Sequence, residues 1–188
     1  MLVKKILIGI LLCFTFICKV CAQFDGQFSQ YMHNLCAINS ANCGEQSMMQ
    51  VTLMQRTQWA GFKGAPIVSM LLADTPFKIG QTEHGAGVQF LSDVFGAFNN
   101  QQVNFAYSYK FKIKENKLSA GINLGFVNII CNGDTLNKFD DISEYHKSYD
   151  PAIPSNKTEG VSFDLGFGMQ YLAQKWRTGI SAVHLNFP

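Results

Sequence analysis

The four histidines have the broadest chemistry in this chain, because a neutral imidazole can bind a metal and can transfer protons near pH 7. They lie far apart in the sequence, at His33, His84, His146 and His184. No HExxH or other metal-ligand spacing connects them. We therefore expect surface or interface histidines rather than metal ligands.

Other catalytic motifs are also missing from the sequence. Residues 85–87 read Gly-Ala-Gly, like the start of a dinucleotide-binding fingerprint, but the third glycine does not follow. No G-x-S-x-G elbow and no P-loop occur. Asp134, Asn137 and Asp140 could bind calcium, but Phe139 stands where an EF-hand loop needs glycine. We expect a solvated acidic loop, no enzyme, no metal site and no cofactor.

Three cysteines follow residue 22, at Cys36, Cys43 and Cys131. This odd number excludes a complete disulfide framework, and the lack of a CxxC pair argues against a zinc site. Cys36 and Cys43 could pair in an oxidising compartment. Two unpaired small residues are the equally open alternative.

The densest group of potential binding residues is 56–66, which reads Arg-Thr-Gln-Trp-Ala-Gly-Phe-Lys-Gly-Ala-Pro. Gly61 and Gly64 permit positive φ, so a turn is expected there. One interpretation is a hairpin turn that is anchored by its packed Trp and Phe. The other is a fixed loop that a partner recognises, because Trp and Arg carry much of the binding energy at interfaces. The residues proposed for that surface, or for the fold beneath it, are Arg56, Trp59, Phe62 and Pro66.

The composition excludes two classes of protein. Charged residues make up 15% of the 188 residues, below the ~25% of ordinary soluble domains, and aromatic residues make up 13%. Disordered chains show the opposite balance. The net charge is +2 and no Lys/Arg cluster occurs in the body of the sequence, so we expect no nucleic-acid partner.

The N-terminus reads as a secretory signal peptide that comprises residues 1–22. Two lysines precede an apolar run over residues 6–18, and Val-Cys-Ala at 20–22 resembles a cleavage site. A transmembrane anchor is the first alternative, but the run is shorter than the ~20 residues of a span. A lipoprotein cleaved before Cys21 is the second, and the residues upstream fit it poorly.

The rest of the chain alternates between apolar and polar residues, which predicts β-strands. The clearest strands are expected at 102–113, 118–126 and 161–171, with weaker ones at 49–59, 66–77, 85–93 and 174–184. Strands of 9–11 residues suit a bilayer crossing. Small polar-face residues suit a crowded lumen, and aromatic residues near strand ends suit a membrane girdle: Tyr107, Tyr109, Tyr171 and Trp176.

These features predict an all-β fold, an antiparallel outer-membrane β-barrel of about eight strands or an incomplete version of a larger barrel. The eighth strand would need residues 23–48, which otherwise read as an irregular N-terminal segment. The barrel domain is expected over 49–188, with a hairpin turn at 114–117 and a long polar external loop at 132–159. The alternation does not reveal which face points outward, so a secreted soluble barrel stays open.

Several elements of the sequence together resemble a known family. They are Gln-Phe-Ser-Gln-Tyr-Met at 27–32, Asn-Ser-Ala-Asn-Cys-Gly at 39–44, the 56–66 element, Thr-Pro at 75–76 and Asp-Pro-Ala at 150–152. In order and spacing they resemble the PorP/SprF family of the type IX secretion system in the Bacteroidota, from residue 25 to about 184. The signature residues are Gln27, Phe28, Gln30, Tyr31, Arg56, Trp59, Gly61, Phe62, Gly64 and Pro66.

The resemblance implies an outer-membrane barrel without enzymatic activity that serves type IX secretion and gliding. Its implied partners are outer-membrane lipid and either periplasmic components of the machinery or secreted adhesins with a type B C-terminal domain. The chain departs from the family at Ser40, where proline is usual, and at Asn42-Cys43, which replace Tyr-Ala. It is also shorter than family members, so a truncated product, a small paralogue and a fragment are open explanations.

Two other functions remain open from the sequence. One is a passive small outer-membrane porin, which needs a continuous water-filled lumen. The other is a secreted soluble β-barrel that binds a small ligand.

Overall fold

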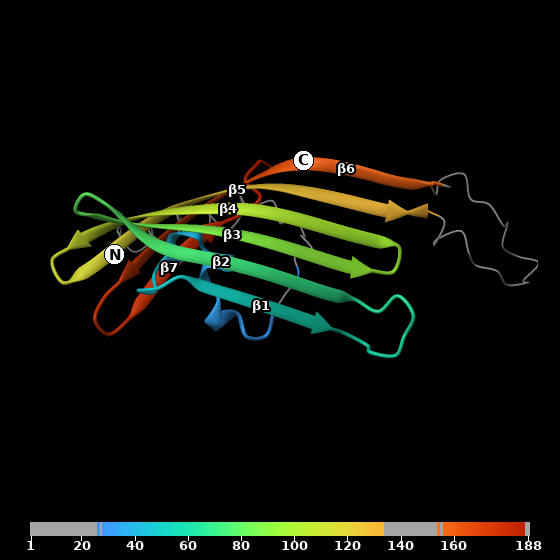
Figure 1. Ribbon diagram of the computed structural model, residues 1–188, viewed down its shortest axis with the longest axis horizontal. Coiled ribbons are helices and arrows are strands. Elements are labelled where there is room, and N and C mark those ends of the chain that lie inside the picture. The colour runs from blue at the N-terminus through green and yellow to red at the C-terminus, as the bar shows by residue number, and fades with distance from the viewer. Residues whose placement is uncertain (1–25, 27, 134–153, 155, 187–188) are drawn as a thin grey trace, which may run out of the picture.

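The computed structural model describes residues 26, 28–133, 154 and 156–186. The described strands form one antiparallel sheet in which each strand pairs with the next (Figure 1). The strands are β1 (Gln50–Thr57), β2 (Ile67–Ile79), β3 (Thr82–Phe95), β4 (Phe98–Ile113), β5 (Asn116–Asn132), β6 (Lys157–Leu172) and β7 (Arg177–Ala182). The sheet curls into a half-barrel, and we call its concave side the lumen. In the described part of the chain, β1 and β7 are not paired with each other.

All seven strands expected from the alternation are present, and β4, β5 and β6 are each 16 or 17 residues long. The described residues of 23–48 add no eighth strand. They form three short helical turns instead: η1 (Tyr31–His33), α2 (Leu35–Ile38) and η2 (Ser40–Asn42). η2 contacts β4, β5 and β6. In the described residues, no helix is long and apolar enough to cross a membrane.

The apolar side chains of the strands point away from the lumen. Exposed examples from the central strands are Leu71, Val88, Phe90, Phe105, Ile122, Leu124, Phe126, Phe163 and Phe167. The lumen side carries buried polar or small residues instead, among them Asn104, Ser108, Ser119, Asp164 and Gln170. A soluble barrel buries its apolar face, whereas a membrane barrel turns it outward. The structure therefore decides in favour of the membrane-barrel arrangement.

The two ends of the half-barrel differ in their connections. Two-residue turns at 80–81 and 114–115 and a four-residue turn at 173–176 lie at one end, which we call the short-turn end. The opposite end, the loop end, carries the β1–β2 loop at 58–66, the β3–β4 turn and the junction between β5 and β6 (Figure 1). Residues 134–153 of the expected external loop lie outside the described residues. At ~3.3 Å per residue, the 16 residues of β4 separate the two ends by about 50 Å along the strand.

Candidate functional site

The N-terminal segment enters the lumen and is bound there by polar contacts. We call residues 34–45 the plug. The Asn39 side chain donates from Nδ2 to the carbonyl oxygens of Met169, at 3.1 Å, and Ile180, at 3.3 Å. These carbonyls belong to β6 and β7, so one amide side chain joins the plug to two neighbouring strands. The Asn39 Oδ1 accepts a hydrogen bond from the backbone N–H of Ala41 at 2.9 Å, which caps η2.

Inward side chains of β2 and β4 hold the other half of the plug. The Ser108 hydroxyl donates to the Cys43 carbonyl at 2.7 Å, and Asp74 accepts from the Gly44 N–H at 2.8 Å. Lys110 Nζ donates to the Gly44 carbonyl. Each of these contacts satisfies a buried backbone group, which would otherwise cost about 1–3 kcal/mol. The strand side chains thus replace the water that the plug would meet outside the lumen.

Glycines on the strands make room for the plug backbone. A Cβ atom at Gly85 would lie 1.9 Å from the Cys43 carbonyl oxygen, and one at Gly121 would lie 2.4 Å from the Ala41 nitrogen. A Cβ at Gly168 would lie 2.0 Å from Asn39 Oδ1. The small polar-face residues that suggested a crowded lumen therefore create the seat of the plug.

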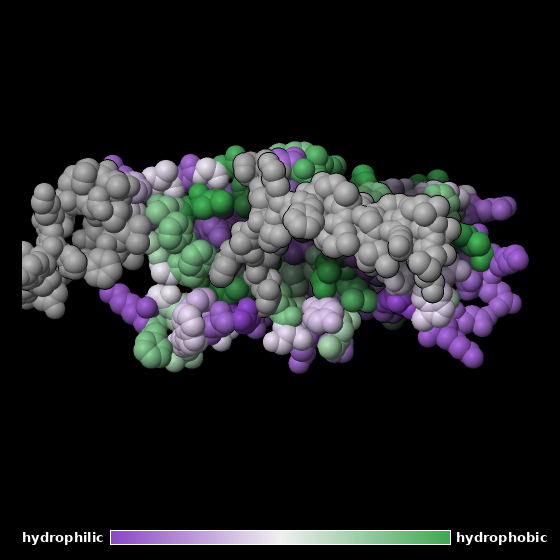
Figure 2. All heavy atoms as spheres, turned by 180° about the vertical axis from the view of Figure 1, so that it is seen from behind, coloured by the Kyte–Doolittle hydropathy of each residue, from purple (hydrophilic) through white to green (hydrophobic). Residues whose placement is uncertain are grey.

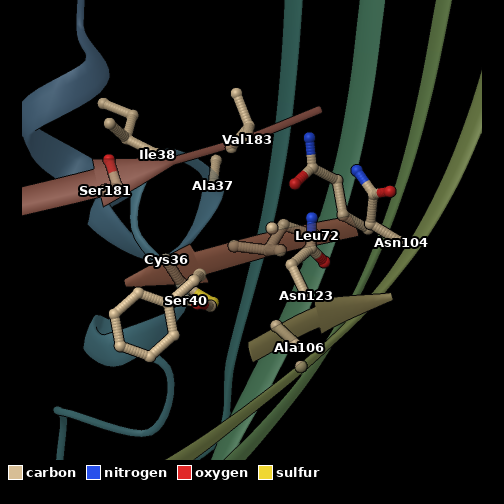
Figure 3. A pocket seen from close by; sticks show the side chains of 14 residues that line it. Cys36, Ala37, Ile38, Ser40, Leu72, Asn104, Ala106, Asn123, Ser181 and Val183 are labelled. Atoms are coloured by element: carbon tan, nitrogen blue, oxygen red, sulfur yellow. The ribbon is translucent and has the colours of Figure 1, made fainter. Parts of the chain in front are cut away.

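Cys36 and Cys43 form a disulfide, which resolves the alternative left open by the sequence. The bridge joins α2 to the residue after η2, and Cys43 is fully buried. Figure 3 shows Cys36 and Ser40 facing Leu72, Ala106 and Asn123 of the strands. The cavity that they line has a volume of only about 20 Å³, so the plug fills this part of the lumen closely.

The 58–66 loop is fixed by backbone hydrogen bonds, but its aromatic side chains are exposed. Trp59 is 71% exposed and Phe62 is 76% exposed, so they do not act as packed anchors. The carbonyl of Pro66 accepts from the N–H of Gln58 at 3.0 Å, which closes the loop. Gly64 accepts from the N–H of Gly96 at 2.9 Å, which joins the loop to the β3–β4 turn.

Backbone conformation explains two glycines of this loop. Gly61 has φ of 101° and Gly64 has φ of 77°, a region that favours glycine. Trp59 also has positive φ, at 50°, which is uncommon for a bulky residue. Such strain persists only where the surrounding structure imposes it.

Arg56 does not share the exposed surface of Trp59 and Phe62. Arg56 lies on the opposite face of β1 from the exposed Leu53. It pairs with Val68, whose side chain is buried on the lumen side. Val68 in turn pairs with Asp93 of β3, and the positive charge of Arg56 acts on that carboxylate. The structure therefore separates the expected partner surface into two exposed aromatic residues and an inward Arg56, with a half-buried Pro66 at the base.

The N-terminal signature residues are also dispersed. Gln27 lies outside the described residues. Phe28 is half-buried and lines a cavity of about 460 Å³ with Met54 and Met70. Gln30 and Tyr31 are exposed. Sequence reasoning missed the residues that bind the plug, although the unusual run of small inward residues signalled where it sits.

The histidines of the described strands have structural partners. The ring nitrogens of His84 contact the hydroxyls of Thr82 and Tyr107, each at 2.7 Å. His184 Nδ1 contacts Asp164 at 2.9 Å. Within the part of the chain that the structure describes, no group of three or more potential ligands could hold a metal ion.

An aromatic cluster surrounds His84 at the short-turn end. Its ring stacks on Phe77 with centroids 5.3 Å apart and meets Tyr109 edge-on at 5.0 Å. Tyr171 and Trp176, also at this end, have ring centroids 5.3 Å apart. Of the four aromatic residues proposed for a girdle, Tyr109, Tyr171 and Trp176 lie near the short-turn end, whereas Tyr107 lies closer to the middle of β4.

Comparisons with known proteins identify one family. Residues 20–188 match the family described as "Type IX secretion system membrane protein PorP/SprF". Neither a curated protein nor a solved structure matches the chain. The match covers nearly the whole sequence and agrees with the outward apolar face. The chain belongs to the PorP/SprF family of type IX secretion system membrane proteins.

Proposed function

We propose that this protein is a non-enzymatic outer-membrane barrel component of the type IX secretion and gliding machinery. Residues 1–22 export it as a signal peptide, its apolar outer face anchors it in lipid, and its 58–66 loop binds a partner. The partner is a periplasmic component of the machinery or a secreted adhesin with a type B C-terminal domain. The observation that carries the partner-binding role is the exposure of Trp59 and Phe62 on a fixed loop.

The physical case for this loop rests on preorganisation. An exposed Trp and Phe leave apolar surface in water, and burying it against a partner is worth roughly 25 cal/mol per Å². Loop hydrogen bonds at Gln58 and Gly64 already hold the backbone, so little ordering entropy remains to be lost on binding. Lys63 adds one exposed positive charge between the two glycines.

The contacts of the plug favour this role over that of a passive porin. A porin needs a water-filled lumen, whereas the plug occupies the lumen between β2, β4 and β6. A secreted soluble ligand-binding barrel is disfavoured by the outward apolar face. The proposed function therefore uses the barrel as an anchor rather than as a passage.

Replacing Trp59 by alanine tests the partner-binding role. We expect the affinity for the partner to fall by about tenfold or more, because an exposed interface Trp is a typical hot spot. In cells that depend on this chain, adhesin display would fall, as measured by antibody labelling of intact cells. Trp176→Ala is the matched control, since Trp176 is 56% exposed at the short-turn end. Normal display at normal levels of the Trp59→Ala protein would contradict the proposal.

A further inference from the structure

Basic side chains gather at the short-turn end. Seven Lys and Arg residues lie in the last six strand positions or the turns there: Lys78, Lys110, Lys112, Lys114, Lys117, Lys175 and Arg177. Only four acidic residues accompany them: Glu45, Asp74, Glu83 and Glu115. Figure 2, in which this end is on the right, shows hydrophilic side chains reaching out from it. We call the seven residues the basic mouth.

Strand register places most of these charges on the lumen side. Lys78 pairs with Glu83, Glu83 with Lys110, and Lys110 with Ser119, which is buried in the lumen. One step nearer the turns, Lys112 pairs with Lys117. Lys117 and Arg177 both pair with Leu172 of β6, so Arg177 lies on the same face of the sheet as Lys117. The outward positions of the same strand ends are Phe77, Ile79, Phe111 and Ile113, all exposed. The strand ends are therefore basic inside and apolar outside.

Part of the positive charge is compensated within the protein. Glu83 bridges Lys112 at 3.2 Å and Lys117 at 2.9 Å. Lys110 is buried and bound to the plug. The other four, Lys78, Lys114, Lys175 and Arg177, are exposed, and no ion pair reaches them within the described residues.

We propose that the basic mouth binds an acidic, carboxylate-rich segment of a partner protein that approaches from the short-turn end. Among the four unpaired residues, the inward positions of Lys78 and Arg177 favour a peptide over lipid headgroups, because lipid would meet the outward Phe and Ile residues. Charge complementarity of this kind mainly supplies association rate and specificity. The surface is distinct from the 58–66 loop, which lies at the opposite end, so this inference does not depend on the role proposed for that loop.

The chain's own acidic segment cannot fill this mouth. Residues 134–153 contain Asp134, Asp140, Asp141, Glu144 and Asp150, and their described neighbours Gly133 and Pro154 lie at the loop end. Twenty residues that leave and return to one end reach at most about 35 Å, at ~3.5 Å per extended residue. The short-turn end is about 50 Å away along β4.

Peptide binding to the purified full-length chain in neutral detergent tests the proposal. The probe is a fluorescein-labelled decaglutamate peptide followed by fluorescence anisotropy. We expect binding that weakens about tenfold or more between 50 and 300 mM NaCl, because exposed charges are screened. The quadruple variant K78E/K114E/K175E/R177E should lose binding. The variant K78Q/K114Q/K175Q/R177Q removes the four charges without reversing them, so its loss of binding should be smaller. Far-UV circular dichroism checks the fold of both variants.

The control variant is K63E/K157E, which reverses two exposed lysines at the loop end. It should bind the peptide like the unchanged protein. Equal loss in the control and the quadruple variant, or no loss in either mouth variant, would overturn the proposal. Binding of anionic phosphatidylglycerol vesicles that the quadruple variant loses, with no binding of decaglutamate to the unchanged protein, would assign the mouth to lipid instead and also overturn it. The loop variant Trp59→Ala should leave peptide binding unchanged, so the two proposals fail separately.

Discussion

Single residues in the lumen determine whether the plug can dock. Gly85 is the clearest case, because any side chain there meets the backbone of Cys43 rather than the end of a flexible side chain. The polar residues Asp74 and Ser108 then bind the backbone groups that the close approach desolvates. Glycine and hydrogen-bonding residues thus act together at adjacent positions of the sheet.

Gly85→Ala should destabilise the protein by about 1–3 kcal/mol, the usual range for overpacking a close contact. Gly160→Ala is the matched control, since a Cβ at Gly160 meets nothing within 4 Å. It should be neutral or stabilising by about 0.4–1 kcal/mol through lower entropy of the unfolded chain. Urea unfolding of both proteins in the same detergent measures the difference. Equal stabilities would show that the plug does not occupy this seat.

At the scale of elements, periodicity predicted the strands but not the plug. The alternation of Val103, Phe105 and Tyr107 has a period of two wherever the strand lies, so β4 could be recognised without tertiary information. Residues 34–45 have no such period. Their structure depends on Ser108 and Lys110, which are 65 and 66 residues away from their partners in the plug. No local pattern encodes contacts of that separation.

The alternation also does not reveal which of the two faces of the sheet points outward. The same pattern of apolar and polar faces suits a soluble barrel and a membrane barrel, and only the curvature of the sheet shows which face is convex. In contrast, the inward direction of Arg56 could have been inferred from the sequence of β1. Arg56 lies on the same face of the strand as Met54 and on the opposite face from Leu53. Of the two roles expected for Arg56, the partner surface or the fold beneath it, its inward direction favours the second.

The disulfide makes the plug element sensitive to reduction. Closing the short loop between Cys36 and Cys43 restricts the unfolded chain and should contribute about 2 kcal/mol in the loop-entropy description. Reduction should therefore lower the urea midpoint of the natural protein and of Cys131→Ser, which keeps the bridge. It should not change the midpoint of Cys36→Ser. A midpoint that is unaffected by complete reduction, checked by thiol titration, would contradict this account.

At the scale of the whole molecule, the two faces and the two ends of the half-barrel have different chemistry. The outer face is apolar, the lumen is polar and contains the plug, the loop end presents Trp59 and Phe62, and the short-turn end is basic. In an outer-membrane barrel the short turns are periplasmic and the longer loops face outward. The proposed orientation therefore presents the aromatic loop to the cell exterior, which favours the secreted adhesin over a periplasmic component as its partner, and it presents the basic mouth to the periplasm.

This orientation is tested by placing a single reactive cysteine at either end of a Cys131→Ser background. We expect Lys63→Cys to react with a membrane-impermeant maleimide on intact cells, because Lys63 is exposed at the loop end. Lys114→Cys, exposed at the short-turn end, should react only after the outer membrane is permeabilised. The opposite pattern would reverse the proposed orientation and exchange the compartments of the two surfaces.

The central claim is that the outward apolar face of the sheet lies in the outer membrane. Fractionation of cells that express the chain with its own N-terminal segment tests it most directly, followed by carbonate extraction of the outer-membrane fraction. We predict that the protein is recovered in the outer membrane and resists carbonate, because Phe105, Leu124 and Phe163 face lipid. Recovery as soluble periplasmic protein would contradict the account.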